Sequence, residues 1–281
     1  MQFILTLSCP DRPGIVHAVT GFLLERGGNI VEAAQFNDSA TGLFFMRVRF
    51  ESPQGAGAED LAAAFADLGT RHQMSYRFHE AARRMPTIVM VSKLGHCLND
   101  LLFRVRSDLL PLDIRAVVSN HRDYYQLSAS YDIPFHHVPV TASTKAAAEA
   151  TLAEIADREG AELVVLARYM QVLSDDLCRR LAGRAINIHH SFLPSFKGAR
   201  PYQQAHDRGV KLIGATAHYV TSALDEGPII EQDVERVDHA TDPARLTAIG
   251  RDVECVVLAR ALLWHAEHRV LINGNKTVIF R

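Results

Sequence analysis

The sequence predicts an α/β protein with two domains: a small, two-layer ferredoxin-like sandwich, followed by a larger domain with a mostly parallel sheet. Three observations lead to this prediction. Apolar runs and helical stretches follow a βαββαβ order as far as about residue 80. Residues 81–86 are Arg-bearing and end in Pro86, as a linker does. Beyond them, short apolar runs alternate with helical stretches, which indicates βαβ units.

In the first domain, each change in hydrophobic periodicity marks a new helix or strand. A helix is expected where Ile15, Val19 and Phe22 share one face, and Gly27-Gly28 marks its end. The turn residues 38–42 predict a hairpin between two strands. In chain order, the expected elements are strand 3–8, helix 14–26, strands 30–37 and 43–51, helix 58–69 and strand 73–79.

The second domain is expected to contain a buried sheet. Residues 163–167 begin Leu-Val-Val-Leu without a polar residue, so this strand is expected to be buried on both faces. Asn273-Gly274 between β-rich flanks predicts a terminal hairpin over 270–280. The other expected elements are strands 87–92, 114–119, 135–139, 185–189, 210–220 and 228–234, and a helix over 242–266.

The composition is that of an ordinary globular chain. Among 281 residues, Lys+Arg 30 against Asp+Glu 32 gives a formal net charge of -2, which offers no basic excess for nucleic acid or an anionic membrane. The N-terminus lacks a signal-peptide pattern, and no apolar run reaches transmembrane length. The four cysteines are far apart and form no CxxC. We therefore expect a cytoplasmic protein with no nucleic-acid partner and no membrane partner.

The segment Asn187-Ile188-His189 carries the clearest sign of chemistry. In an extended chain Asn187 and His189 point to the same face, and loop-forming residues follow directly. Asn donates a hydrogen bond to a carbonyl oxygen, and His donates one or moves a proton. This pair suits acyl-type chemistry, in which negative charge builds up on an oxygen.

Asp225 is the expected partner of this pair. It lies between two apolar runs, 225 − 189 = 36 residues after His189. A carboxylate beside a His fixes its tautomer and holds its protonated form. A satisfied polar trio at strand ends would fit the same spacing equally well.

Longer motifs around these residues resemble the formyltransferase-fold folate enzymes. The motifs are Asn187-Ile188-His189-x-Ser191-x-Leu193-Pro194, Gly214-x-Thr216-x-His218-x-Val220 and Asp225-x-Gly227-Pro228-x-Ile230. Two fuller strings, residues 166–173 and 187–199, look most like the members that hydrolyse the formyl group. The resemblance covers almost the whole chain. It implies a Rossmann-like formyltransferase domain over 87–281, a linker at 83–86 and an ACT regulatory or dimerisation domain over 1–82.

The resemblance implies hydrolysis of 10-formyltetrahydrofolate to formate and tetrahydrofolate, which balances one-carbon folate pools and supplies formate for purine synthesis. The family's catalytic residues fall on Asn187, His189 and Asp225. Asn187 and His189 would stabilise the formyl oxyanion, and Asp225 would support His189 and activate water. This scheme needs no cofactor and no metal. The histidine pairs 136–137 and 189–190 lack a ligand-like cluster.

Two loops are implied to hold the folate. By similarity, the candidate contacts are Arg168, Tyr169, Met170, Val172, Leu173, Ser222 and Leu224. For the apolar residues among them, core packing explains the pattern equally well. His218 lies two residues from Thr216 on one strand face. It either supports the catalytic residues from behind or is a hydrogen-bonded structural residue, and the structural role is the stronger interpretation.

Transfer of the formyl group to an amine is the competing enzymatic hypothesis. Transferases of the family cradle the acceptor's phosphate in a Gly-rich loop after the first strand. The corresponding residues here, 92–97, keep one Gly among bulkier residues, which favours water, although Lys93 in this loop would still be able to bind an anion. His190 stands where transferases usually have Pro, and this also resembles the hydrolytic pattern. A folate or amino-acid sensor is the non-enzymatic hypothesis, and the intact trio speaks against it.

The N-terminal residues 11–15 and 28–30 resemble an ACT domain. This resemblance implies pairing into a homo-oligomer and an amino-acid effector, with glycine or methionine as candidates. The implied contacts are Asp11, Gly14, Asn29 and Ile30. These residues also fit a purely structural role in turns and caps.

Overall fold

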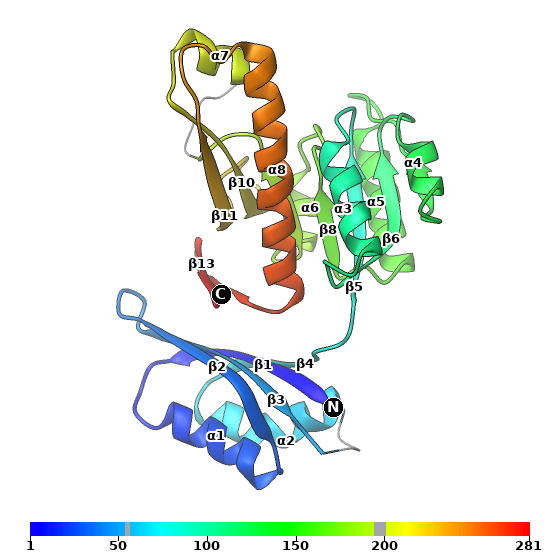
Figure 1. The fold of residues 1–281 in the computed structure, drawn as a ribbon. Coiled ribbons are helices and arrows are strands. Elements are labelled where there is room, and N and C mark those ends of the chain that lie inside the picture. The colour runs from blue at the N-terminus through cyan, green and yellow to red at the C-terminus, as the bar shows by residue number, and fades with distance from the viewer. Residues whose placement is uncertain (54–56, 194–200) are drawn as a thin grey trace. The chain divides into compact units, whose positions relative to one another are not determined.

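The computed structural model describes residues 1–53, 57–193 and 201–281. They form two compact units (Figure 1). The first comprises residues 1–83, 267–273 and 278–281. The second comprises residues 84–266 and 274–277.

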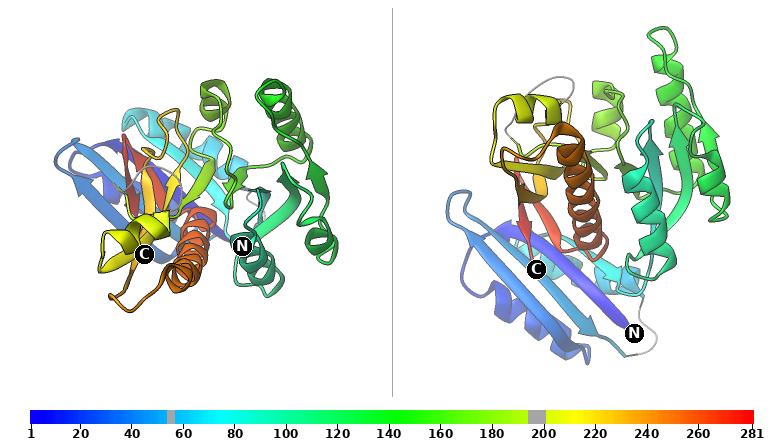
Figure 2. Two further views of the ribbon diagram at one scale, coloured as in Figure 1. Left: turned by 90° about the horizontal axis from the view of Figure 1, so that it is seen from above. Right: turned by 45° about the horizontal axis from the view of Figure 1, so that its top comes forward.

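The first unit has the predicted βαββαβ order. Its elements are β1 (Gln2–Pro10), α1 (Ile15–Glu25), β2 (Asn29–Asp38), β3 (Leu43–Glu51), α2 (Ala58–Arg71) and β4 (Ser75–Glu80). The sheet order is β2-β3-β1-β4, and β1 pairs antiparallel with both β3 and β4. Figures 1 and 2 show α1 and α2 on the same face of this sheet. The core there is rich in aromatic rings, including Phe22, Phe65 and Phe78.

Most of the C-terminal segment, residues 267–273 and 278–281, belongs to the first unit. β12 (Val270–Asn273) and β13 (Lys276–Ile279) form the predicted hairpin. Val278 and Phe280 are buried with Phe45 of β3, and they therefore belong to the first unit. From its position in the sequence, this segment was predicted to belong to the second domain. Arg47 is fully buried beside it and donates to the backbone oxygen of Glu267.

The second unit is built on a seven-stranded sheet of order β11-β10-β9-β8-β5-β6-β7. Its strands are β5 (Met85–Val91), β6 (Leu112–Ser119), β7 (Phe135–His137), β8 (Leu163–Leu166), β9 (Ala185–His189), β10 (Leu212–Tyr219) and β11 (Ile229–Arg236). The first five are parallel, while β10 pairs antiparallel with β9 and with β11. All of β8 is buried, as its uninterrupted apolar run predicted.

The linker expected at 83–86 is shorter than the sequence suggested. Met85 and Pro86 are buried and belong to β5, where they pair with Leu112 and Asp113. Proline lacks a backbone N–H, and the first residues of a strand tolerate this loss. Pro86 therefore lies at the start of a strand rather than at the end of a linker.

Helices flank this sheet. They are α3 (His96–Arg106), α4 (Tyr125–Ala129), α5 (Lys145–Arg158), α6 (Asp175–Arg180), α7 (Pro201–Asp207) and α8 (Pro243–Ala266). In Figures 1 and 2, α8 runs alongside β10 and β11, and it also contacts α3. Residues from α3, α8 and the β9–β10 pair therefore come close together.

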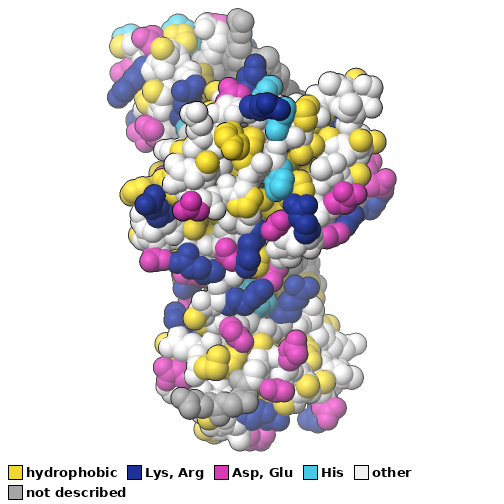
Figure 3. All heavy atoms as spheres, turned by 90° about the vertical axis from the view of Figure 1, so that its right-hand side faces the viewer, with side chains coloured by type: hydrophobic (Ala, Val, Ile, Leu, Met, Phe, Trp, Pro, Cys, Tyr) yellow, Lys and Arg dark blue, Asp and Glu magenta, His cyan; other side chains and the backbone are white. Residues whose placement is uncertain are grey.

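The surface mixes charges of both signs. On the face drawn in Figure 3, Lys and Arg side chains are interspersed with Asp and Glu, in keeping with the formal net charge of -2. Within the described ranges, no helix combines the length and the apolar character that crossing a membrane requires.

Candidate active site

The antiparallel pairing of β9 with β10 brings four polar residues together. Asn187 lies opposite His218, and His189 lies opposite Thr216. Because side chains alternate along a strand, all four lie on one face, while Ile186 and Ile188 of β9 are buried on the other. The sequence predicted that Asn187 and His189 share a face, but it did not predict that β10 pairs with their strand.

Asp225 reaches this face from the loop between β10 and β11. Its Oδ2 lies 3.3 Å from His189 Nδ1, and its Oδ1 lies 3.6 Å from His218 Nε2. Asp225 has a left-handed backbone with φ 57°, which Asp tolerates better than most residues. The carboxylate is thus shared between two histidines, only one of which the sequence assigned to it.

The loop that carries Asp225 is fixed by a close approach at Gly227. A Cβ atom there would lie 1.7 Å from the backbone oxygen of Tyr219. Tyr219 N also donates to Pro228 O at 2.9 Å, which closes the loop. Only glycine lets the chain turn this tightly beside β10 and aim Asp225 at the histidines.

The histidines hold the Asp225 carboxyl in its ionised form. Hydrogen bonds from His189 and then from His218 lower the pKa of Asp225 far below its ordinary value, and they outweigh the opposing effect of burial. Asp225 is therefore an anion throughout the neutral range. A carboxylate in this state favours the protonated form of the imidazole beside it.

His189 Nε2 is the free polar atom of the site. It is buried and has no hydrogen-bond partner among the described residues, while the Nδ1 atom of the same ring faces Asp225. The side chain of Asn187 lies on the same strand face, and its Nδ2 is 3.3 Å from His218 Nε2. An N–H at His189 Nε2 is therefore available to an oxygen brought from outside the chain.

His218 and Thr216 support the site from β10. His218 is buried, and its Nδ1 donates to Tyr219 O at 2.9 Å. Thr216 Oγ1 donates to Ser191 O and accepts from Leu193 N, which ties down the chain after His189. The sequence favoured a structural role for His218, whereas its Nε2 faces both Asn187 and Asp225.

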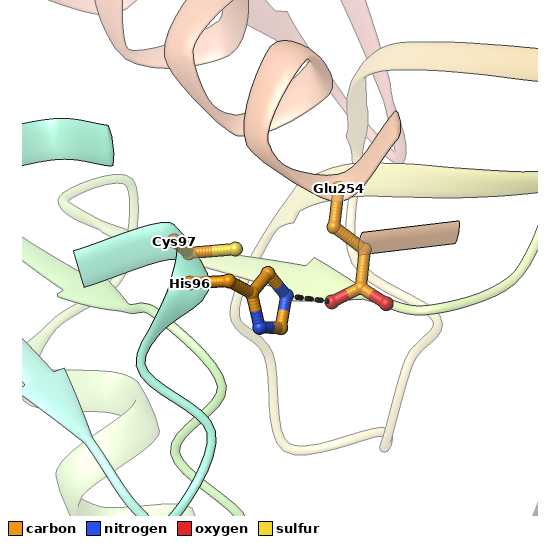
Figure 4. A group of neighbouring side chains, drawn as sticks. All are labelled: His96, Cys97 and Glu254. Carbon is orange, nitrogen blue, oxygen red and sulfur yellow. Dashed lines mark hydrogen bonds and ion pairs between the residues drawn. The ribbon is translucent and has the colours of Figure 1, made fainter. Parts of the chain in front are cut away.

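A second buried cluster lies beside the site. Glu254 of α8 is 1% exposed; its Oε2 lies 2.8 Å from His96 Nε2 and 3.3 Å from Arg168 Nε. Tyr202 donates to its other oxygen at 2.8 Å. Figure 4 shows His96, at the start of α3, pointing at Glu254 across the gap between the two helices. Burial raises the pKa of Glu254, but the His96 hydrogen bond and the Arg168 charge outweigh it and leave the pKa below its ordinary value.

This cluster is an ion-pair network. His96, Cys97 and Glu254 place possible metal ligands close together. However, the Glu254 carboxylate already faces the Arg168 guanidinium and the Tyr202 hydroxyl. The sequence singled out neither His96 nor Glu254. They are 158 positions apart and belong to no short motif.

The residues expected to hold folate lie in two different environments. Arg168 and Leu173 are buried, whereas Met170 is 57% and Val172 is 55% exposed. Tyr169, Val172 and Leu173 line a small pocket together with Glu149 and Leu152 of α5. Burial raises the pKa of Tyr169 to about 12. Ser222 and Leu224 lie exposed on the Asp225 loop.

Tyr124 packs against part of the loop after β5, in which Lys93 and Leu94 are exposed. The ring of Tyr124 packs against Gly95, where an added Cβ would lie 2.2 Å from it, and the Tyr124 hydroxyl donates to Lys93 O. Residues 194–199, part of the longer motif, lie outside the described residues.

Comparisons with known proteins match both units. A family model described as Formyl transferase matches residues 85–262, and one described as ACT domain matches residues 3–66. A formyltetrahydrofolate deformylase of Corynebacterium sp. (strain P-1) is 52% identical over 100% of this chain and 99% of that protein. This chain belongs to the formyltetrahydrofolate deformylase family. The predicted resemblance and the predicted fold class, an ACT domain followed by a Rossmann-like formyltransferase domain, are confirmed.

Solved structures of deformylases and of formyltransferases both resemble this chain. The crystal structure of a family member from Burkholderia mallei is 53% identical, covers 100% of this chain and 99% of that one, and has a TM-score of 0.96. A glycinamide ribonucleotide transformylase from Symbiobacterium toebii is 30% identical, covers 73% of this chain and 97% of its own, and has a TM-score of 0.67. The deformylase family thus shares its larger fold with transferases and adds the N-terminal domain.

Proposed function

We propose that this chain hydrolyses 10-formyltetrahydrofolate to formate and tetrahydrofolate. The observation that carries the proposal is His189, whose Nδ1 faces Asp225 while its buried Nε2 has no partner among the described residues. An imidazole held in this way presents one N–H to a developing oxyanion. Relatives 42% to 52% identical, which carry the name formyltetrahydrofolate deformylase, support the choice of substrate.

The reaction divides among three side chains. Water attacks the formyl carbon and forms a C–O bond, while the π electron pair of the carbonyl moves to the formyl oxygen. Asn187 Nδ2 and His189 Nε2 donate hydrogen bonds to that oxygen. Asp225 keeps His189 protonated and orients the water or takes its proton. The C–N10 bond then breaks, N10 keeps the electron pair and takes a proton, and formate leaves.

Water is the proposed acceptor because the loop after β5 is poorly suited to a phosphate. The Tyr124 ring packs against Gly95, its hydroxyl occupies the backbone oxygen of Lys93, and His96 at the start of α3 is turned towards Glu254. A phosphate cradle needs several backbone N–H groups open to the ligand. Formate released in this way would balance the one-carbon folate pools and supply purine synthesis.

The folate is proposed to lie along the loop after β8. Met170 and Val172 expose apolar side chains there, and Leu224 on the Asp225 loop is 62% exposed. Exposed apolar side chains beside a polar site are suited to cover a flat aromatic ring system. The buried Arg168 side chain does not face outward, and its proposed role is given below.

The ACT domain is proposed to form a homo-oligomer and to bind an amino acid such as glycine or methionine. β2 is an edge strand on which the apolar side chains of Val31 and Phe36 are 51% and 46% exposed. An unpaired edge of this kind is a template for a second copy. Near it, Asp11 pairs with Asn37, Gly14 takes φ 92° at the start of α1, and Asn29 and Ile30 begin β2.

The direct test is formate release from 10-formyltetrahydrofolate with no acceptor amine present. We expect one formate per tetrahydrofolate, measured by chromatography of the folate and a coupled formate assay. Formate that appears only after an amine is added, or no formate at all, would replace hydrolysis with transfer or with binding.

A further inference from the structure

The carboxyl ends of three neighbouring strands surround the proposed catalytic trio. β9, β8 and β5 are adjacent and parallel, so these ends lie along one edge of the sheet. His189 ends β9, Arg168 follows β8 by two positions, and the loop that leads to His96 follows β5. In open α/β sheets, ligands bind in the crevice outside this edge. Side chains placed along it therefore decide what reaches the trio.

The trio and the cluster around Glu254 belong to opposite sides of the sheet. Ala185 shares the strand face of Asn187 and His189, and it is buried with residues of α5 and α6. The helices of the cluster, α3 and α8, lie on the other side (Figure 2). The small pocket beside the proposed folate loop is lined by α5. A folate bound there reaches the trio from the α5 side, which leaves the α3 and α8 side for the acceptor of the formyl group.

Side chains fill this second side. The side chains of His96, Arg168 and Glu254 are 16%, 8% and 1% exposed. Tyr202 donates to Glu254 and lies against Gly250, one turn earlier on α8, where a Cβ atom would be 2.0 Å from the Tyr202 hydroxyl. The absence of a side chain at Gly250 therefore makes room for the ring that closes the cluster.

Arg168 takes its place in the cluster at a cost in free energy. Its backbone is left-handed, with φ 64°, which is uncommon outside glycine. Its buried Nε lies 3.3 Å from Glu254 Oε2 but has no hydrogen-bond partner among the described residues. Ser92 N donates to Arg168 O at 3.2 Å and fixes the turn. Strain and an unsatisfied buried donor on one residue indicate a functional role rather than a stabilising one.

We infer that Arg168 is a specificity-determining residue, whose side chain, packed with His96 and Glu254, occupies the acceptor side of the trio and admits water but no larger nucleophile. This inference rests on the proposed hydrolysis. It assigns Arg168 no step in the chemistry, because exclusion requires only that the side chain fill the space.

The test offers glycinamide as a small amine acceptor. In a transfer, the amine nitrogen bonds to the formyl carbon and loses a proton, while the C–N10 bond breaks and N10 keeps the electron pair and takes a proton. The products are N-formylglycinamide and tetrahydrofolate. At pH 8, about half of an α-amino group of this kind is unprotonated and able to attack. An arginine side chain has more non-hydrogen atoms than glycinamide, so its removal makes room for the amine.

Arg168→Gly is the decisive variant, because the left-handed backbone at this position suits glycine. Wild type should yield formate almost alone. In Arg168→Gly we expect the ratio of N-formylglycinamide to formate, measured by mass spectrometry, to rise by about ten-fold or more, since even one methylene group changes discrimination in a pocket on this order. The ratio does not depend on the amount of folded enzyme, so a purely structural effect would leave it unchanged. Asp132→Gly, at φ 58° in an exposed loop, is the matched control.

His96→Ala opens the same side from α3 and should raise the ratio as well. A ratio unchanged in Arg168→Gly, or in His96→Ala if Arg168→Gly does not fold, would overturn the inference. Folded Arg168→Gly that has lost formate release would overturn it too, because a residue that only excludes acceptors is not needed for hydrolysis. Wild type that releases no formate would instead refute the proposed function.

Discussion

Asp225 is the residue on which the proposed chemistry depends most directly. Asp225→Asn keeps the shape of the side chain but removes the charge that favours protonated His189. We expect kcat to fall by about 100- to 1,000-fold, the usual effect of losing a stabilising group for an oxyanion. Folate binding, measured by fluorescence quenching, should be unchanged. Turnover that survives in Asp225→Asn would remove this carboxylate from the mechanism.

The same carboxylate makes stability depend on pH. The pKa of Asp225 is lower in the folded chain than in the unfolded chain, because His189 and His218 donate to it. The resulting stabilisation is present above the unfolded pKa of about 3.9 and is lost as the pH falls towards the folded pKa. The melting temperature of wild type should therefore exceed that of Asp225→Asn at pH 7, and the gap should shrink below about pH 4. A gap that does not depend on pH would contradict this linkage.

Some residues of the site could be predicted from the sequence, and others could not. Asn187 and His189 were predictable because a two-residue spacing in a strand fixes a shared face. Asp225 was predicted from its motif, and the structure places it within reach of His189. His218, His96 and Glu254 carry no local signal, because their partners are brought to them only by strand pairing and helix packing.

The loop between β10 and β11 is the element most sensitive to a small change. Gly227→Ala would place a methyl group against the backbone oxygen of Tyr219 and push the loop away from β10. Because a displacement of about 1 Å can cost on the order of 100-fold in rate, we expect a loss of that size in kcat. Gly21→Ala, in the middle of α1 with open space around it, is the matched control and should keep full activity. Normal turnover in Gly227→Ala would show that the loop tolerates the shift.

Elements were easier to predict than their pairing. The expected strands and helices in both units are present, since their period-2 and period-3.6 patterns are local properties. The start of β5 at Met85 was missed because Pro86 suggested a linker. The antiparallel placement of β10 against β9 was not predicted, and this pairing is what sets His218 beside Asn187.

At the scale of the whole molecule, the edge strand β2 is the proposed contact between copies of the chain, which mutation tests. Val31→Glu combined with Phe36→Glu replaces two exposed apolar side chains of this edge strand by charges, which pairing with a second copy would bury. We expect the molar mass from light scattering to fall towards that of one chain, while Phe103→Glu, an exposed change on α3, leaves it unchanged. A wild type of single-chain mass would refute the proposed oligomer.

The amino-acid sequence by itself determined the two-domain α/β class, the order of elements and the side chains of the trio. These follow from periodicity, from turn residues and from motifs that are short along the chain. Only the tertiary structure decided that Asp225 is shared by two histidines, that Glu254 is held by Arg168, His96 and Tyr202, and that the C-terminal hairpin covers Phe45. The physical reason is that these contacts join residues far apart in sequence. Their meeting depends on strand register and helix packing, which no local pattern encodes.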